Sequence, residues 1–326
     1  MNEGHRRFQV YAWVVAWSMI PVILWGAFVR ISKSGAGCGE HWPTCKGEVI
    51  PLEASAETVI EFVHRLMSGG LGFLVLLLVV WAWRSFPSKH RVRKAAMATF
   101  LFVLAEGAIG AALVLFGLTG DDPRPIRGLV IALHLVNTLV LVAFSVLTAH
   151  FAGSERRLNW TAPGRNKWGL YVGLILVLLV SATGAVTALG DTLFPIELQL
   201  DGGLLAHIET ELSPGQHFLV RLRIIHPILA VGSALYLLYL ANALHTPEAT
   251  SKVRTLSSIV AILVVVQVVI GLTNIVLAAP TWIQLVHLTI ADLLWIALVL
   301  LTVRTLEEPD AVIEQATPAS SMNEQP

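Results

Sequence analysis

Apolar residues dominate eight long stretches of the chain, and each stretch is bounded by polar or charged residues. A run of about 20 apolar residues is long enough to cross a bilayer as a helix. Because open sheet edges cannot face lipid, runs of this length are predicted to be helical. The predicted spans are roughly 10–30, 58–83, 95–118, 128–150, 168–189, 217–244, 255–279 and 282–303.

Composition agrees with this pattern. The chain is 55% hydrophobic and 13% charged, whereas soluble proteins carry about 25% charged residues. Its formal net charge of +0 gives no support for nucleic-acid binding. We therefore predict an all-α polytopic membrane protein with eight transmembrane helices, whose first apolar run is a retained span and whose polar tail is disordered from about residue 305.

Lysine and arginine predict the orientation. With the N-terminus in the cytoplasm, the cytoplasmic segments hold fourteen of these residues and the outer segments hold five. Positively charged residues are enriched in cytoplasmic loops. The chain is therefore predicted to lie in the cell membrane with both termini cytoplasmic.

Both cysteines, Cys38 and Cys45, fall in the first outer loop. An oxidising exterior favours a disulfide between them. A redox-active pair and two free thiols are the alternatives that the sequence leaves open.

The spans repeat in two halves of four, which we predict to be 1–155 and 156–326. Gly26 near the end of the first span is echoed by Gly184 in the fifth, and Gly110 in the third by Gly271 in the seventh. Small residues are common at helix interfaces, so the glycines alone are weak evidence. The stronger signal is one histidine near the start of each even-numbered span: His64, His134, His226 and His287.

These four histidines are predicted to lie at matched depth, roughly 10 Å below the outer boundary. Ionisable groups inside membranes are rare and usually functional. Two histidines on facing helices can bind a haem iron from both sides, which predicts one site from His64 with His134 and another from His226 with His287. Packed histidines, a zinc or copper site and a di-iron site are the alternatives.

Other charged residues in the spans suggest further roles. Arg65 and Arg223 are candidate partners for haem propionates, since arginine pairs well with carboxylates. Glu61 shares a helix face with His64 and is predicted to act as an acid–base or charge-stabilising catalytic group, the alternative being a salt bridge to a neighbouring arginine. Glu106 and Asp292 are expected only to form hydrogen bonds between helices.

The chain resembles the haem A synthase family over about residues 10–303. The resemblance rests on segments 26–30, 34–38 and 42–45, on the Glu-Phe-Val-His-Arg segment 61–65, and on His134, His226 and His287. It implies haem b as a cofactor held by His226 and His287. It also implies haem O as the substrate held by His64 and His134, with its C8 methyl group oxidised to a formyl group, and it matches Glu61 and the Cys38–Cys45 pair to the family's own residues.

The partners implied are haem O, an electron acceptor that the sequence does not identify, haem O synthase and a second copy of the chain. Some bacterial members carry another cysteine pair between spans five and six, but this chain has none there. The alternative functions are a bis-histidine haem b protein for membrane electron transfer and a transporter built from repeats.

Overall fold

The computed structural model describes residues 3–52, 54–159, 165–195, 213 and 215–308, which form helices joined by loops and contain no named strand. Within this part of the chain, eight helical segments are long and apolar enough to cross a membrane. Each overlaps one of the predicted spans, which differ from the helices by a few residues at their ends, and this confirms the all-α membrane fold. The helices are α1 (Glu3–Ile31), α2 (Ala56–Ser85), α3 (Arg91–Leu115), α4 (Pro125–Ala152), α5 (Arg165–Leu193), α7 (Phe218–Leu222), α8 (Ile225–Leu244), α9 (Ser251–Val276) and α10 (Thr281–Leu306), with a short 3-10 helix η1 (Ser34–Ala36) in the loop between α1 and α2.

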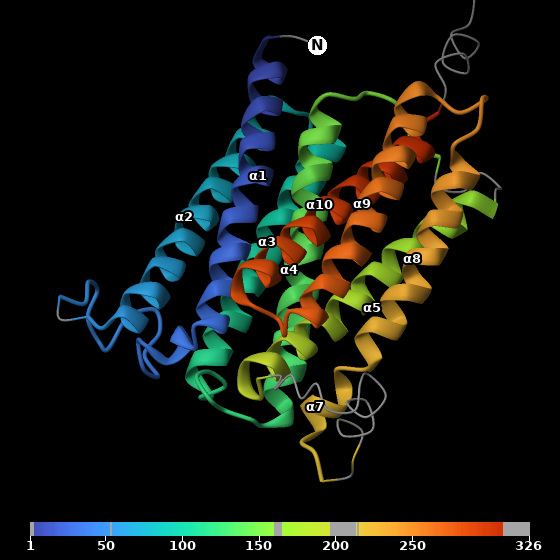
Figure 1. Ribbon diagram of the computed structural model, residues 1–326. Helices are drawn as coiled ribbons and strands as arrows, with labels where there is room; N and C mark the ends of the chain where they lie inside the picture. The colour runs from blue at the N-terminus through green and yellow to red at the C-terminus, as the bar shows by residue number, and fades with distance from the viewer. Residues whose placement is uncertain (1–2, 53, 160–164, 196–212, 214, 309–326) are drawn as a thin grey trace, which may run out of the picture.

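The helices pack as two groups of four, α1 to α4 and α5 with α8 to α10 (Figure 1). Within each group, every helix contacts the next and the last contacts the first. The groups meet where α4 and α10 pack on each other and on α5 and α1. This arrangement is compatible with two related halves. The division at residues 155 and 156 stays a prediction.

Helix α10 lies at the centre of the molecule, because it contacts α1, α4, α5 and α9. Its indole Trp295 is buried and donates a hydrogen bond to the backbone carbonyl of Leu139 in α4, at 2.6 Å. A polar group in a membrane needs such an internal partner. This contact therefore fixes the packing of the two halves deep in the bundle.

The sixth span is interrupted where its arginines occur. Helix α7 ends at Leu222 and α8 begins at Ile225, so Arg223 lies in the break. The side chain of Arg223 is buried there and lies 2.9 Å from the carboxylate of Asp191 at the end of α5. A paired charge is far less costly in an apolar region than an isolated one.

The chain does not become irregular at residue 305 as predicted, because α10 continues to Leu306. Its end is held by Glu307, whose carboxylate accepts hydrogen bonds from His150, Ser154 and Arg304. The backbone amide of Glu308 then donates a hydrogen bond to the backbone carbonyl of Arg157. The rest of the predicted tail, 309–326, lies outside the described residues.

Candidate functional site

All four histidines of the even-numbered spans line one cavity of about 1420 Å³. A pocket for one drug-sized ligand occupies about 300–1,000 Å³, so this cavity has room for more than one such molecule. The histidines come from α2, α4, α8 and α10, two from each half, and each ring is half-buried. The structure thus brings together the four residues that the repeat singled out.

The histidines fall into two pairs by position. His64 and His134 belong to the amino-terminal group of helices, and His226 and His287 to the carboxy-terminal group. Each pair joins the second and fourth long helices of one half. These are the pairs predicted from the sequence, although their role as ligands stays a prediction.

Glycines on the odd-numbered spans lie against the histidine rings. A Cβ atom placed on Gly26 would lie 2.9 Å from the Cε1 atom of His64, and one on Gly184 or Gly271 would lie 3.0 Å from the Cε1 atom of His226 or His287. Real Cβ contacts are rarely this short, so a larger side chain would push the imidazole aside. The glycine echoes therefore have a structural reason, which is to let each ring pack on the neighbouring helix.

The fourth contact between a glycine and a histidine is looser, because a Cβ atom on Gly110 would lie 4.0 Å from the Cε1 atom of His134. Here the ring has a different partner, since the Nδ1 atom of His134 lies 3.1 Å from the Oε1 atom of Glu106. Sequence reasoning missed this link and gave Glu106 no connection with the histidines. The sequence does carry a signal for this link. Glu106 lies four residues before Gly110, and Gln267 lies four residues before Gly271.

The remaining rings contact polar groups of their own half. The Nδ1 atom of His226 lies 3.1 Å from the carbonyl oxygen of Val180, and the Nε2 atom of His287 lies 3.2 Å from the side-chain nitrogen of Gln267. Among the described residues, no hydrogen-bond partner is found for the Nδ1 atoms of His64 and His287. Both atoms are buried, so each is a polar group that the surrounding protein leaves unsatisfied.

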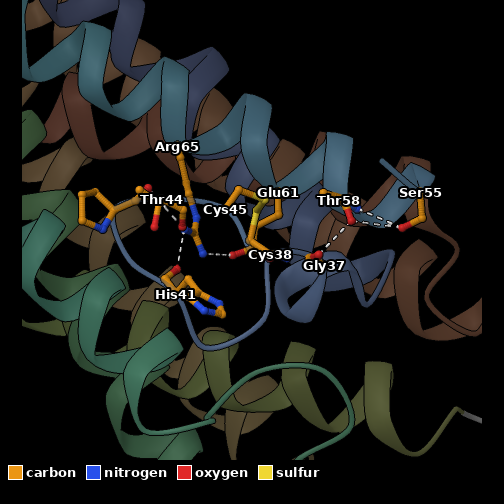
Figure 2. Close-up of a disulfide and its surroundings, with 10 residues drawn as sticks. Gly37, Cys38, His41, Thr44, Cys45, Ser55, Thr58, Glu61 and Arg65 are labelled. Carbon is orange, nitrogen blue, oxygen red and sulfur yellow. Dashed lines mark hydrogen bonds and ion pairs between the residues drawn. A yellow bond between two sulfur atoms is a disulfide. The ribbon is translucent and has the colours of Figure 1, made fainter. Parts of the chain in front are cut away.

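Glu61 is buried and holds the disulfide loop (Figure 2). Its Oε2 atom accepts a hydrogen bond of 2.8 Å from the backbone amide of Cys38, and its Oε1 atom forms an ion pair of 2.5 Å with Arg65. The salt bridge that the sequence left open is therefore present. Glu61 also lines the cavity beside His64, so a catalytic role stays a prediction.

Arg65 makes most of its contacts with the same loop. It donates hydrogen bonds to the backbone carbonyls of His41 and Thr44, at 2.7 and 2.6 Å, besides its pairing with Glu61 (Figure 2). The loop is closed by the disulfide between Cys38 and Cys45, which confirms that pairing, and both cysteines are fully buried. Arg65 reaches the cavity wall, and its pairing with a propionate stays a prediction.

A second connection joins the loop after α1 to the loop after α3. Lys33, just after α1, lies 2.8 Å from Asp121, in the connection between α3 and α4. This ammonium group lowers the pKa of Asp121 by hydrogen bonding and by its charge. Both side chains are largely exposed, so the pair contributes little to stability.

Three further arginines line the cavity. Arg30 of α1 donates to the carbonyl oxygen of Ala188 and to the hydroxyl group of Thr192 in α5, at 2.5 and 2.7 Å. Arg127 donates to two backbone carbonyls of the loop before α4. Arg223 precedes His226 in the sequence by the same number of residues as Glu61 precedes His64. The two halves therefore carry opposite charges at equivalent positions.

The carboxy-terminal pair has the features that a haem b site needs. His226 and His287 supply imidazole nitrogens on two helices, and Gly184 and Gly271 let both rings pack closely on the backbone. Arg223 reaches the cavity wall together with Asp191, its ion-pair partner. Bis-imidazole ligation is compatible with this donor set.

Comparison with known proteins agrees with this geometry. A family model described as cytochrome oxidase assembly protein matches residues 9–299. A protein of Thermus thermophilus named "Protoheme IX farnesyltransferase" is 44% identical over 280 residues, which cover 85% of this chain and 45% of that protein.

Proteins named "Heme A synthase" are also similar. Those of Halalkalibacterium halodurans and Symbiobacterium thermophilum are 34% and 37% identical over 155 and 175 residues. These matches cover 48% and 50% of this chain, and 49% and 54% of the two relatives. The chain thus spans about half the length of the curated relatives it matches. Because the family model covers nearly the whole chain, the protein belongs to the family of cytochrome oxidase assembly proteins that includes the haem A synthases.

Proposed function

We propose that this protein is a haem A synthase, which oxidises the C8 methyl group of haem O to a formyl group. The observation that carries the proposal is a cavity lined by both histidine pairs, one from each half. The amino-terminal pair, His64 and His134, would bind the substrate haem O. The carboxy-terminal pair, His226 and His287, would hold haem b.

Side chains cannot remove electrons from an unactivated methyl group, and haem b supplies one-electron redox chemistry when bound. The chain's own residues bind and orient the substrate. His64 and His134 would place the macrocycle against the cavity wall, where Gly26 lets the ring of His64 pack on α1. Arg30, Arg127 and Arg65 place positive charge at the outer end of the same cavity, which suits the substrate's propionates.

Glu61 is the proposed catalytic group. It lines the cavity near His64, and the amide of Cys38 and the side chain of Arg65 hold its carboxylate in place. A fixed carboxylate can stabilise positive charge that develops at the methyl carbon, or take up a proton released there. The disulfide loop would therefore serve to hold this carboxylate in position.

The proposal is tested by supplying haem O to membranes that contain the protein and measuring haem A by chromatography. Glu61→Gln keeps the size of the side chain and removes its charge. We expect it to lower the conversion rate about 100-fold, with the content of bound haem unchanged. Conversion at the wild-type rate would exclude the catalytic role of Glu61, and no conversion by the wild-type protein would exclude the function.

A bis-histidine haem b protein for electron transfer remains the alternative function. The same histidine pairs would serve it, but the protein would then hold haem b alone. Haem extracted from the purified protein separates the two functions, because the synthase should also retain haem O or haem A.

We also propose the location and the partners. The lysine and arginine distribution favours the cell membrane with both termini in the cytoplasm. The Thermus relative carries the name of the farnesyl-transferring enzyme and extends well beyond the matched region. This supports an association with haem O synthase, which would supply the substrate. The electron acceptor and self-association are left for experiment.

A further inference from the structure

Glu106 in α3 makes three side-chain contacts with α4. Its Oε1 atom lies 3.1 Å from the Nδ1 atom of His134 and accepts a hydrogen bond of 2.5 Å from the hydroxyl group of Thr138. Its Oε2 atom accepts a hydrogen bond of 2.5 Å from the amide of Asn137. Three partners on two oxygens hold the carboxylate in one orientation, with one oxygen against the histidine ring.

The other half provides an internal comparison. Aligning Gly110 with Gly271 places Gln267 at the position of Glu106, and Gln267 contacts His287 as Glu106 contacts His134. Aligning the two histidines places Ile290 and Ala291 at the positions of Asn137 and Thr138. The carboxylate and both donors that orient it are therefore present in the amino-terminal half and are replaced together in the carboxy-terminal half.

The atoms contacted also differ between the halves. Glu106 lies against the Nδ1 atom of His134, which leaves the Nε2 atom for a ligand in the cavity. Gln267 is neutral and lies against the Nε2 atom of His287. A carboxylate behind a metal-binding histidine fixes the ring orientation and makes the imidazole a stronger electron donor, whereas an amide does so only weakly.

We propose that Glu106 is a positioning residue that orients His134 and favours the ferric state of the haem bound in the amino-terminal half. This inference rests on the proposed function, since it assumes that His134 binds the iron of that haem. The negative charge acts at short range within an apolar bundle, where salt screens it little. The carboxy-terminal half lacks this charge, so the two sites differ electronically although their histidines match.

The test is a redox titration of the purified protein followed in its visible haem bands. The component that disappears in His64→Ala is assigned to the amino-terminal half. We expect Glu106→Gln to raise the ferrous-to-ferric ratio of this component about tenfold at a fixed potential, which is about 59 mV for a one-electron couple. The component of the carboxy-terminal half should not change.

Two variants control for general damage. Glu57→Gln removes a carboxylate from the exposed start of α2, and it should leave both components unchanged. Glu106→Asp keeps the charge, so its potential should lie nearer that of the wild type than that of Glu106→Gln. If Glu106→Gln does not fold, the triple variant Glu106→Gln, Asn137→Ile, Thr138→Ala replaces it, because the chain uses that combination in its other half.

The outcomes separate the inference from the function. A wild-type protein without haem would overturn the proposed function. A protein that binds two haems, with a titration that Glu106→Gln does not change, would overturn the inference and leave the function standing. A shift in both components alike would also overturn it, because the carboxylate would then act on the bundle as a whole.

Discussion

Gly26 of α1 and His64 of α2 lie so close together that a side chain larger than the glycine hydrogen would collide with the imidazole ring. A Cβ atom on Gly26 would lie 2.9 Å from the Cε1 atom and 3.2 Å from the Nε2 atom of His64. The same relationship recurs between Gly184 and His226 in the other half. The position of each imidazole in the cavity therefore depends on a residue of the preceding span.

Replacing Gly26 by valine should displace the ring of His64 and disable the amino-terminal site. We expect the variant to lose about half of its bound haem, since the tightly packed backbone cannot move away, while the haem of the other half stays. The pyridine haemochrome of the purified protein measures this content. Gly72→Val is the matched control, because no atom lies within 4 Å of a Cβ at Gly72. Equal loss in both variants would contradict the assignment of a specific role to Gly26.

Arg30 connects the two halves near the end of α1, where it donates hydrogen bonds to Ala188 and Thr192 of α5 and to Gln284 of α10. Arg30→Gln should leave some of these acceptors unsatisfied and destabilise the protein by about 1–3 kcal/mol. A thermal melt in detergent measures the effect. Arg7→Gln serves as control, since Arg7 pairs with Glu3 on the exposed surface and should contribute less than about 1 kcal/mol. Equal melting temperatures for the two variants would rule out this bridging role.

The disulfide between Cys38 and Cys45 is expected to be structural. The double substitution Cys38→Ser, Cys45→Ser should destabilise the protein by about 2–3 kcal/mol, as expected for so short a loop. It should also lower the synthase rate, because Cys38 donates to Glu61. If the pair has an obligatory redox role, the rate will instead fall to zero in a variant that still binds haem and melts normally.

Glu307 should make the stability of the bundle at the end of α10 depend on pH. Burial opposes its ionisation, but hydrogen bonds from His150 and Ser154 outweigh burial and lower the pKa of Glu307 from 4.5 to about 2. Its contribution is therefore fully present above pH 4.5 and is lost as the pH falls toward 2.

We expect Glu307→Gln to destabilise the protein by about 2 kcal/mol at pH 7 and by much less near pH 2. Thermal melts at both pH values measure the difference. Glu3→Gln, which changes an exposed carboxylate, should have little effect at either pH. A destabilisation by Glu307→Gln that is independent of pH would show that its charge is unimportant.

Much of the architecture could be predicted from the sequence, because spans and histidine placement depend on the order of residues along single helices. Contacts between helices could not. The link between Glu106 and His134 depends on how α3 rotates against α4, which the apolar pattern does not determine. The hydrogen bonds from the guanidinium group of Arg65 to two backbone carbonyls of the disulfide loop likewise depend on how that loop folds back, and its predicted pairing with a propionate stays a prediction.

The break before α8 could be predicted from the sequence only in part. Arg221 and Arg223 already marked the start of the sixth span as unusual for a membrane helix. The physical reason for the break is visible only with Asp191 opposite Arg223. The charge of Arg223 therefore has a partner, which only the fold identifies.

The most direct test of the two-haem arrangement is the haem extracted from the purified protein, separated by chromatography, with each of the four histidines replaced by alanine in turn. We predict that His64→Ala and His134→Ala lose haem O and haem A and keep haem b, while His226→Ala and His287→Ala lose haem b. A haem content that is unchanged in all four variants would contradict the account.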